Sequence, residues 1–301
     1  MRRRRLVALS VTAAVVLLAS CSGTSPEHRG DHGNGKGGHS AAPDPPGSRP
    51  GTGLSGDAGG VERFFGPMVR PGNGGSFGLS RAVFLPQRDS RLGQVVRVRY
   101  PAQSASPTVS RDYHRPQGGA QLYLPLKSGP VDALHLRYYV RFPREFDFVR
   151  GGKLPGLYGG TVTSGRRIPD GGNGLSTRYM WRTGGAAEVY AYLPTSVEHG
   201  TSLGRGSWHW PTGRWVCVEQ AVRLNTPGRS DGTIDVSLDN KRVLHAGGLE
   251  FRTTDRLGID GVFFSTFFGG SDPSWATPRA QYADFAGFAV STRPIGPVRP
   301  G

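Results

Sequence analysis

The residues of this chain best suited to chemistry alternate with apolar side chains in two short segments, near residues 180 and 190. Ser176, Arg178 and Arg182 share one side of the first segment, and Tyr190 and Tyr192 share one side of the second. Side chains two residues apart on a strand lie about 7 Å apart on the same surface. If the two segments are adjacent strands, a serine, two arginines and two phenols form a single solvated patch.

A patch of these residue types could perform β-elimination on a uronate polymer. That reaction needs a cation for the carboxylate, a base for the C5 proton and an acid for the departing 4-oxygen. Arg178 can hold a carboxylate with its forked guanidinium. Either tyrosine can serve as base or acid if a nearby cation lowers its phenol pKa from about 10. Lys153, which lies upstream among glycines, is that cation or the base itself. The spacing leaves open which phenol does what.

The elements that must position these residues are predicted to be β-strands. Period-2 alternation dominates the chain beyond residue 60, and no segment shows a long amphipathic helical stripe. Many short strands separated by glycine and proline predict an all-β fold, a two-sheet jelly roll with a concave groove. The predicted strands span residues 95–100, 134–142, 175–182, 188–193, 215–224, 261–268 and 282–290, with a hairpin over 233–245.

The amino terminus predicts export. Arginines at 2–5 precede an apolar stretch over 6–18, and the sequence Leu-Ala-Ser-Cys that ends at Cys21 resembles a bacterial lipobox. An ordinary secretory signal with a chance cysteine is the alternative. We expect a lipid-anchored protein on the extracellular face of the bacterial cell membrane, or a secreted one. The predicted regions are a signal peptide over 1–20, a disordered Gly/Pro-rich tether over 21–60 and the β domain over 61–301.

The charge of the chain points to an anionic partner. The formal net charge is +15, and only four of the 37 basic residues are lysine. Such a surface suits nucleic acid, an anionic membrane or an acidic polysaccharide, and export argues against nucleic acid. The dispersed histidines predict no metal site, and Cys217 is expected to be a buried thiol. We predict a monomer without a cofactor; a calcium ion held by main-chain oxygens would leave no motif.

Two further patterns in the sequence have ordinary explanations. The stretch Gly74–Gly78 matches the G-x-S-x-G pattern of hydrolase nucleophiles, but that pattern needs a strand–turn–helix in an α/β sheet, so a turn is predicted. The paired carboxylates that glycoside hydrolysis needs do not occur in a suitable pattern. Trp208 and Trp210 are expected to pack in the core or at a groove rim.

Three motifs in order resemble polysaccharide lyase family 14, the alginate and glucuronan lyases. They are the stretch Gly151–Gly160, the Ser-x-Arg and Met-Trp-Arg run over 176–182, and Tyr-Ala-Tyr-Leu-Pro over 190–194. The resemblance extends from about residue 95 to 290 and omits residues 61–90. It implies a β-jelly roll and β-elimination on polyuronates.

The resemblance also implies the site residues. The functional lysine of the family falls on Lys153, and its two tyrosines fall on Tyr190 and Tyr192, which we predict to be catalytic. Its Ser-x-Arg falls on Ser176 and Arg178, which together with Arg182 are predicted to bind substrate. The substrate is expected to be an acidic polysaccharide, but the resemblance does not identify which one, because the subsite residues differ among family members. The rival hypothesis is a surface lectin of the same fold, and a structural lipoprotein is a third.

Overall fold

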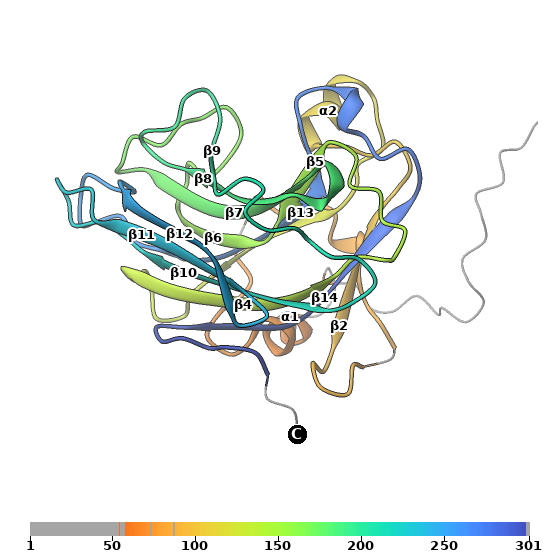
Figure 1. Cartoon of the computed structure of the whole chain (residues 1–301), viewed down its shortest axis with the longest axis horizontal. Helices are drawn as coiled ribbons and strands as arrows, with labels where there is room; N and C mark the ends of the chain where they lie inside the picture. Colours follow the sequence, from red (N-terminus) through yellow and green to blue (C-terminus); the bar gives the residue numbers. More distant parts are fainter. Residues whose placement is uncertain (1–53, 55–57, 73, 87, 299–301) are drawn as a thin grey trace, which may run out of the picture. The chain divides into compact units, whose positions relative to one another are not determined.

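The computed structural model describes residue 54 and residues 58–72, 74–86 and 88–298. Over these residues the chain forms two antiparallel sheets that face each other (Figure 1). The predicted signal peptide, Cys21 and most of the predicted tether lie outside the described residues. No helix in the described part is long and apolar enough to cross a membrane.

The first sheet has seven strands, and its neighbours are far apart in sequence. The strand that comes last in the sequence, β14, lies inside this sheet, between β2 and β4. In spatial order the strands are β1 (Ala82–Phe84), β2 (Val95–Tyr100), β14 (Gln281–Ser291), β4 (Ala133–Arg141), β10 (Val216–Arg223), β11 (Gly232–Leu238) and β12 (Lys241–Leu249).

The second sheet, which contains the predicted site strands, also has seven strands. In spatial order they are β3 (Ala120–Pro125), β13 (Gly261–Phe268), β5 (Gly151–Leu154), β7 (Gly174–Arg182), β8 (Ala187–Tyr192) and β9 (Thr201–Leu203), with β6 (Gly156–Gly160) paired to β13 and β7. Every strand pair in both sheets is antiparallel. The two-sheet arrangement confirms the predicted all-β fold.

Alternation along β7 and β8 divides their side chains between core and groove. Tyr179 and Trp181 of β7 and Val189 and Ala191 of β8 are fully buried between the sheets, as their spacing predicts. Period 2 then sends the intervening residues to the opposite face of the same sheet. The core fixes the strands, and the strands therefore fix the direction of the candidate site residues. Trp208 is also in the core, as expected.

Short helices complete the fold. They are the α-helices α1 (Ala58–Phe65) and α2 (Pro107–Asp112) and the 3-10 helices η1 (Leu79–Arg81), η2 (Thr183–Gly185) and η3 (Pro273–Trp275). Phe65 of α1 packs against Phe264 and Phe288, one from each sheet. Leu54 is only 4% exposed and belongs to the same core, so the folded unit includes residues that precede position 61.

Candidate active site

A cavity of about 1220 Å³ lies on the outer face of the second sheet, and we call it the groove. Its floor comes from β5, β7 and β8, and α2 with the stretch that follows β13 lines its rim. Within the floor, Arg178 of β7 pairs in register with Tyr190 of β8, and Lys153 of β5 pairs with Met180 of β7. The structure thus brings together Lys153, Arg178, Arg182, Tyr190 and Tyr192 along one cavity.

Lys153 occupies the groove without an acidic partner. Its Nζ atom donates to Met180 Sδ at 2.7 Å and lies 3.4 Å from the centre of the Tyr190 ring. Among the described residues no carboxylate lies within ion-pair distance of this amine. Burial, together with the positive charges of Arg178 and Arg182, lowers the pKa of Lys153 well below 10.5, and the negative Glu188 opposes this only in part. A thioether and an aromatic face replace water as the neighbours of the amine, and this environment shifts Lys153 toward its neutral form.

The two phenols differ in their environments. The Tyr192 side chain is only 3% exposed, and its hydroxyl donates a short hydrogen bond to the Gly165 carbonyl. Tyr190 is half-buried, with its ring centre 5.7 Å from that of Tyr192. Burial, with a contribution from Tyr192, raises the pKa of Tyr190 to about 12, although Arg182 and Arg178 oppose the rise. Burial raises the pKa of Tyr192 as well. The cations therefore do not bring either phenol pKa below its ordinary value.

Arg178 is a buried cation with unused hydrogen-bonding capacity. Its side chain is 2% exposed, its guanidinium carbon lies 4.5 Å from the centre of the Phe263 ring, and its Nη1 donates to Ser265 Oγ at 3.2 Å. The Nε atom is buried and has no hydrogen-bond partner in the described structure. Burial lowers the pKa of Arg178. A buried guanidinium without a carboxylate is suited to an anion that enters the groove.

Arg182, by contrast, is already paired. Its Nη2 and Nε atoms donate to Glu188 Oε1 at 2.5 and 3.0 Å, and Glu188 is fully buried. Arg205 adds a longer contact of 3.8 Å to the other carboxylate oxygen. Arg182 therefore contributes a fixed positive charge beside Tyr190 rather than an empty fork. Alternation in the sequence places Glu188 on the same strand face as Tyr190 and Tyr192, but no sequence pattern indicates its ion pair with Arg182.

Ser176 is the one predicted site residue that does not line the groove. It is fully buried, and its hydroxyl donates to the Thr163 carbonyl at 2.7 Å. β6 pairs along this end of β7, with Tyr158 opposite Ser176, and the loop after β6 includes Thr163. The hydroxyl thus holds that loop in place.

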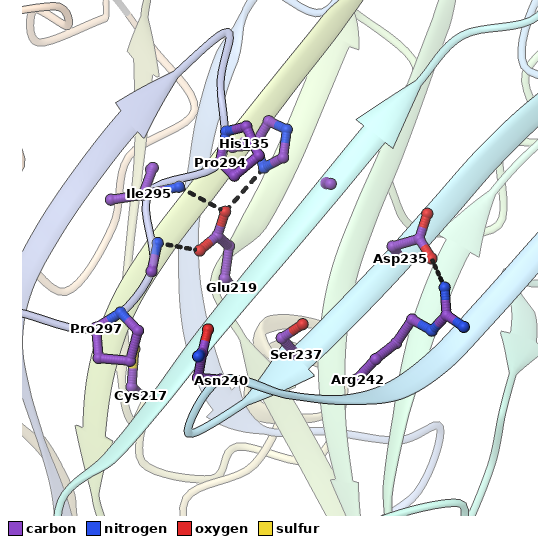
Figure 2. Close-up of a pocket in the computed structure, with 12 residues that line it drawn as sticks. His135, Cys217, Glu219, Asp235, Ser237, Asn240, Arg242, Pro294, Ile295 and Pro297 are labelled. Carbon is purple, nitrogen blue, oxygen red and sulfur yellow. Dashed lines mark hydrogen bonds and ion pairs between the residues drawn. The ribbon is translucent and has the colours of Figure 1, made fainter.

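A second cavity, of about 540 Å³, lies on the outer face of the first sheet (Figure 2). There the Glu219 carboxylate accepts hydrogen bonds from His135 Nδ1 and from the main-chain N–H groups of Ile295 and Gly296. Figure 2 shows these contacts holding the segment after β14 against the sheet. Cys217, which lines this cavity, is a buried free thiol, as expected, and burial raises its pKa to about 11. The acidic groups here are already paired, unlike Lys153 and Arg178 of the groove.

Comparisons with known proteins agree with this geometry. The sequence model of polysaccharide lyase 14 matches residues 88–288, which include every predicted catalytic and substrate-binding residue. A comparison with curated proteins found no match.

Two solved structures show the same fold. An alginate lyase of family 14 from Aplysia kurodai is 32% identical, with a TM-score of 0.63 over 73% of this chain and 90% of that one. An alginate lyase from a Chlorella virus is 23% identical, with a TM-score of 0.62 over 75% of this chain and 93% of that one. On the evidence of the matched sequence and of the Aplysia enzyme, the chain belongs to polysaccharide lyase family 14.

Proposed function

We propose that this chain cleaves a uronate polymer of the alginate or glucuronan type, with Lys153 as the base and Tyr190 as the acid of the β-elimination. The observation that carries the proposal is the position of the Lys153 amine, 3.4 Å above the Tyr190 ring in the groove and without an acidic partner in the described structure. The Aplysia relative is an alginate lyase, which supports the substrate class.

Arg178 is the residue that binds the carboxylate of the sugar. Its guanidinium lines the groove beside the catalytic pair, whereas that of Arg182 is held by Glu188. A cation on the carboxylate stabilises the negative charge that develops when the C5 proton leaves. The burial of Arg178 strengthens this interaction, because charges away from water are screened less.

The pKa directions assign the two proton transfers. The lowered pKa of Lys153 increases the share of neutral amine, and this form takes the C5 proton and becomes an ammonium. The electron pair of the C5–H bond forms the C4–C5 double bond, and the bond from C4 to the glycosidic oxygen breaks. Tyr190, whose pKa of about 12 keeps it protonated, donates its proton to that oxygen. The ammonium then returns a proton to the phenolate, so the site is restored.

Tyr192 and Ser176 support the reaction by position. Tyr192 directs its hydroxyl to the Gly165 carbonyl, and Ser176 directs its own to the Thr163 carbonyl, so both hold the loop at the groove edge. This assignment gives Tyr192 a smaller part in proton transfer than Tyr190. Replacement of Tyr190 by phenylalanine should therefore lower kcat by about 100-fold, and the same change at Tyr192 should lower it less.

The direct test is ultraviolet absorbance during incubation of the protein with mannuronate, guluronate and glucuronate polymers. β-Elimination leaves a conjugated 4,5-unsaturated uronate that absorbs, whereas hydrolysis does not. We expect a rising signal with at least one polymer and its loss in Lys153→Ala. A flat signal across the panel would contradict the proposed reaction, and salt-sensitive binding without cleavage would favour a lectin.

We also propose that the protein is exported and anchored by lipid on Cys21. The support is the order of the arginine, apolar and lipobox-like segments in the sequence. Expression in a bacterial host with labelled fatty acid should give a labelled, membrane-associated protein, and Cys21→Ser should give neither. Label that persists in Cys21→Ser would contradict the anchor.

A further inference from the structure

The stretch Gly74–Gly78, which we call the glycine segment, is neither a nucleophile elbow nor a free turn. The main-chain N–H of Phe77 donates to the Gln121 carbonyl at 3.1 Å, and the N–H of Gln121 donates to the Phe77 carbonyl at 2.8 Å. Gln121 belongs to β3, an edge strand of the second sheet. The glycine segment therefore continues the sheet by one short antiparallel contact, outside the range matched by the family.

The glycines let the main chain approach β3 more closely than other residues could. Gly75 has a φ of +66°, and a Cβ atom there would lie 2.7 Å from Tyr123 Cε2. Gly78 has a φ of +67°, and a Cβ atom there would lie 2.2 Å from the Gly119 carbonyl oxygen. Both positions combine a left-handed backbone with a lack of space, which only glycine tolerates. The position of the segment is thus specified by its sequence.

This placement brings the side chain of Phe77 into the groove. Phe77 is partly exposed and lines the same cavity as Lys153 and Tyr190. Its ring centre lies 6.0 Å from that of Phe267, at an interplanar angle of 52°. Phe267 is in turn the β13 residue that pairs in register with Lys153. Two aromatic rings therefore form an apolar wall beside the predicted base.

A chain of hydrogen bonds also links the glycine segment to Arg178. Gln121 Nε2 donates to the Gly75 carbonyl at 2.7 Å, and Gln121 Oε1 accepts from Ser265 Oγ at 3.0 Å. Ser265 Oγ accepts from Arg178 Nη1. The segment that carries Phe77 and the predicted carboxylate-binding residue are thus held in one hydrogen-bonded framework.

We propose that Phe77 binds the apolar face of a sugar ring of the uronate chain near the cleaved bond, and so helps to position the polymer. A pyranose ring presents C–H groups on its faces and polar groups around its edge. The negative face of an aromatic ring attracts such C–H groups without competing for the polar edge. This inference rests on the proposed function for the nature of the ligand.

The test compares Phe77→Leu with the wild type on a polymer that the protein cleaves. Loss of the aromatic face should raise KM about threefold to tenfold and leave kcat within about twofold. Phe77→Tyr should restore the wild-type KM. Phe84→Leu is the matched control, because Phe84 packs against the core in β1 and does not line the groove. An unchanged KM in Phe77→Leu would overturn the proposal.

A binding measurement separates this proposal from the proposed function. Calorimetry of Lys153→Ala with the polymer, with and without Phe77→Leu, should show the same threefold to tenfold loss of affinity. If the wild type cleaves no polyuronate, the proposed function fails, yet the affinities still decide whether Phe77 contacts the sugar. Equal affinities in the two variants would overturn the role of Phe77 even in an active lyase. Melting temperatures of all variants check that each one is folded.

Discussion

The charged clusters around Asp284 on the first sheet and around Lys153 on the second differ in how their buried charges are paired. On the first sheet, Asp284 is 1% exposed and lies between Arg97 at 2.8 Å and Arg141 at 2.9 Å. Each arginine also lies over an aromatic ring, that of Tyr282 or Trp215. The charges around Asp284 are matched within the protein, although Arg137 on the same face has buried Nε and Nη1 atoms without a hydrogen-bond partner in the described structure. The difference indicates where buried charges are left unpaired in the folded protein, at a cost in stability, and are available to a charged ligand.

On the second sheet, cations outnumber acids. Lys153, Arg178 and Arg182 line the groove, and the neighbouring Glu188 is paired with Arg182. Unmatched buried cations cost folding free energy, because burial removes hydration that no counter-ion replaces. A polyanionic substrate would supply the missing charge. The comparison thus predicts that substitutions at Lys153 and Arg178 reduce activity and spare stability, whereas substitution of Asp284 does the reverse.

The largest expected effect is that of Lys153→Met. Loss of the base should lower kcat about 1000-fold. The melting temperature should rise, because the pKa of Lys153 is lowered in the fold and the unfolded chain binds the proton more tightly. The wild type should therefore gain stability as pH rises toward 10.5, and Lys153→Met should lack this part of the gain. Absorbance assays and calorimetric melting measure both changes.

Lys127→Met is the matched control for this substitution. Lys127 forms an exposed ion pair with Glu62 at 3.2 Å and does not line the groove. Its loss should leave kcat unchanged and alter stability by less than about 1 kcal/mol. A Lys153→Met protein that keeps wild-type turnover would rule out the assigned base.

Asp284→Asn should have the opposite signature. Removal of the shared negative charge leaves Arg97 and Arg141 facing each other, and breaking a buried pair typically costs about 3–5 kcal/mol. Denaturant unfolding should show that loss, while kcat and KM of the folded protein stay near wild type. Asp235→Asn, at a more exposed pair with His245, should cost less than about 1 kcal/mol. Equal losses in the two variants would remove the contrast between the sheets.

Arg178→Lys tests whether the groove needs a forked cation or only a charge. Lysine keeps the charge and loses the bidentate geometry, so kcat/KM should fall about 100-fold. Arg182→Lys should have a smaller effect on kcat/KM, because Glu188 and not the substrate receives its hydrogen bonds. Steady-state kinetics on one polymer compares the two. If Arg182→Lys were the more damaging change, the roles of the two arginines would have to be exchanged.

The sequence predicted the strands and the direction of most site residues because both follow from period 2. The core face of β7 and β8 is apolar at every second position except Thr177, so Arg178, Arg182 and Tyr190 had to face outward. The hairpin of β11 and β12 followed from its Asp-Asn turn in the same way. Lys153 was put forward from its glycine-rich surroundings only as a cation or a base, and the family resemblance supported its place in the site, because one lysine among glycines carries no periodic signal.

The remaining features depend on contacts between distant segments. Ser176 faces outward by alternation, yet β6 and the loop that contains Thr163 cover that end of β7. Phe77 meets Phe267 across the sheet edge, and no local pattern reports such a contact. The raised phenol pKa values were also missed, since the balance between burial and neighbouring arginines depends on depth, which spacing does not give.

The smallest expected effect is a shift in the pH profile of Glu188→Gln. Glu188 raises the pKa of Lys153, so removal of its charge should lower that pKa further. Only the neutral amine acts as base, and the acid limb of kcat/KM should therefore move to lower pH. The groups that face Lys153 with charge or a titratable proton are Arg178 and Arg182 from β7 and Glu188 and Tyr190 from β8.

The alkaline limb separates this electrostatic effect from simple damage to the fold. It reports Tyr190, whose pKa is about 12, and Glu188 is not among the groups that set that value. The acid limb should thus move while the alkaline limb stays, which loss of packing would not produce. Glu62→Gln, at the exposed pair with Lys127, should move neither limb. An acid limb that stays in place or moves to higher pH in Glu188→Gln would mean that Lys153 is not the group that limits the rate at low pH.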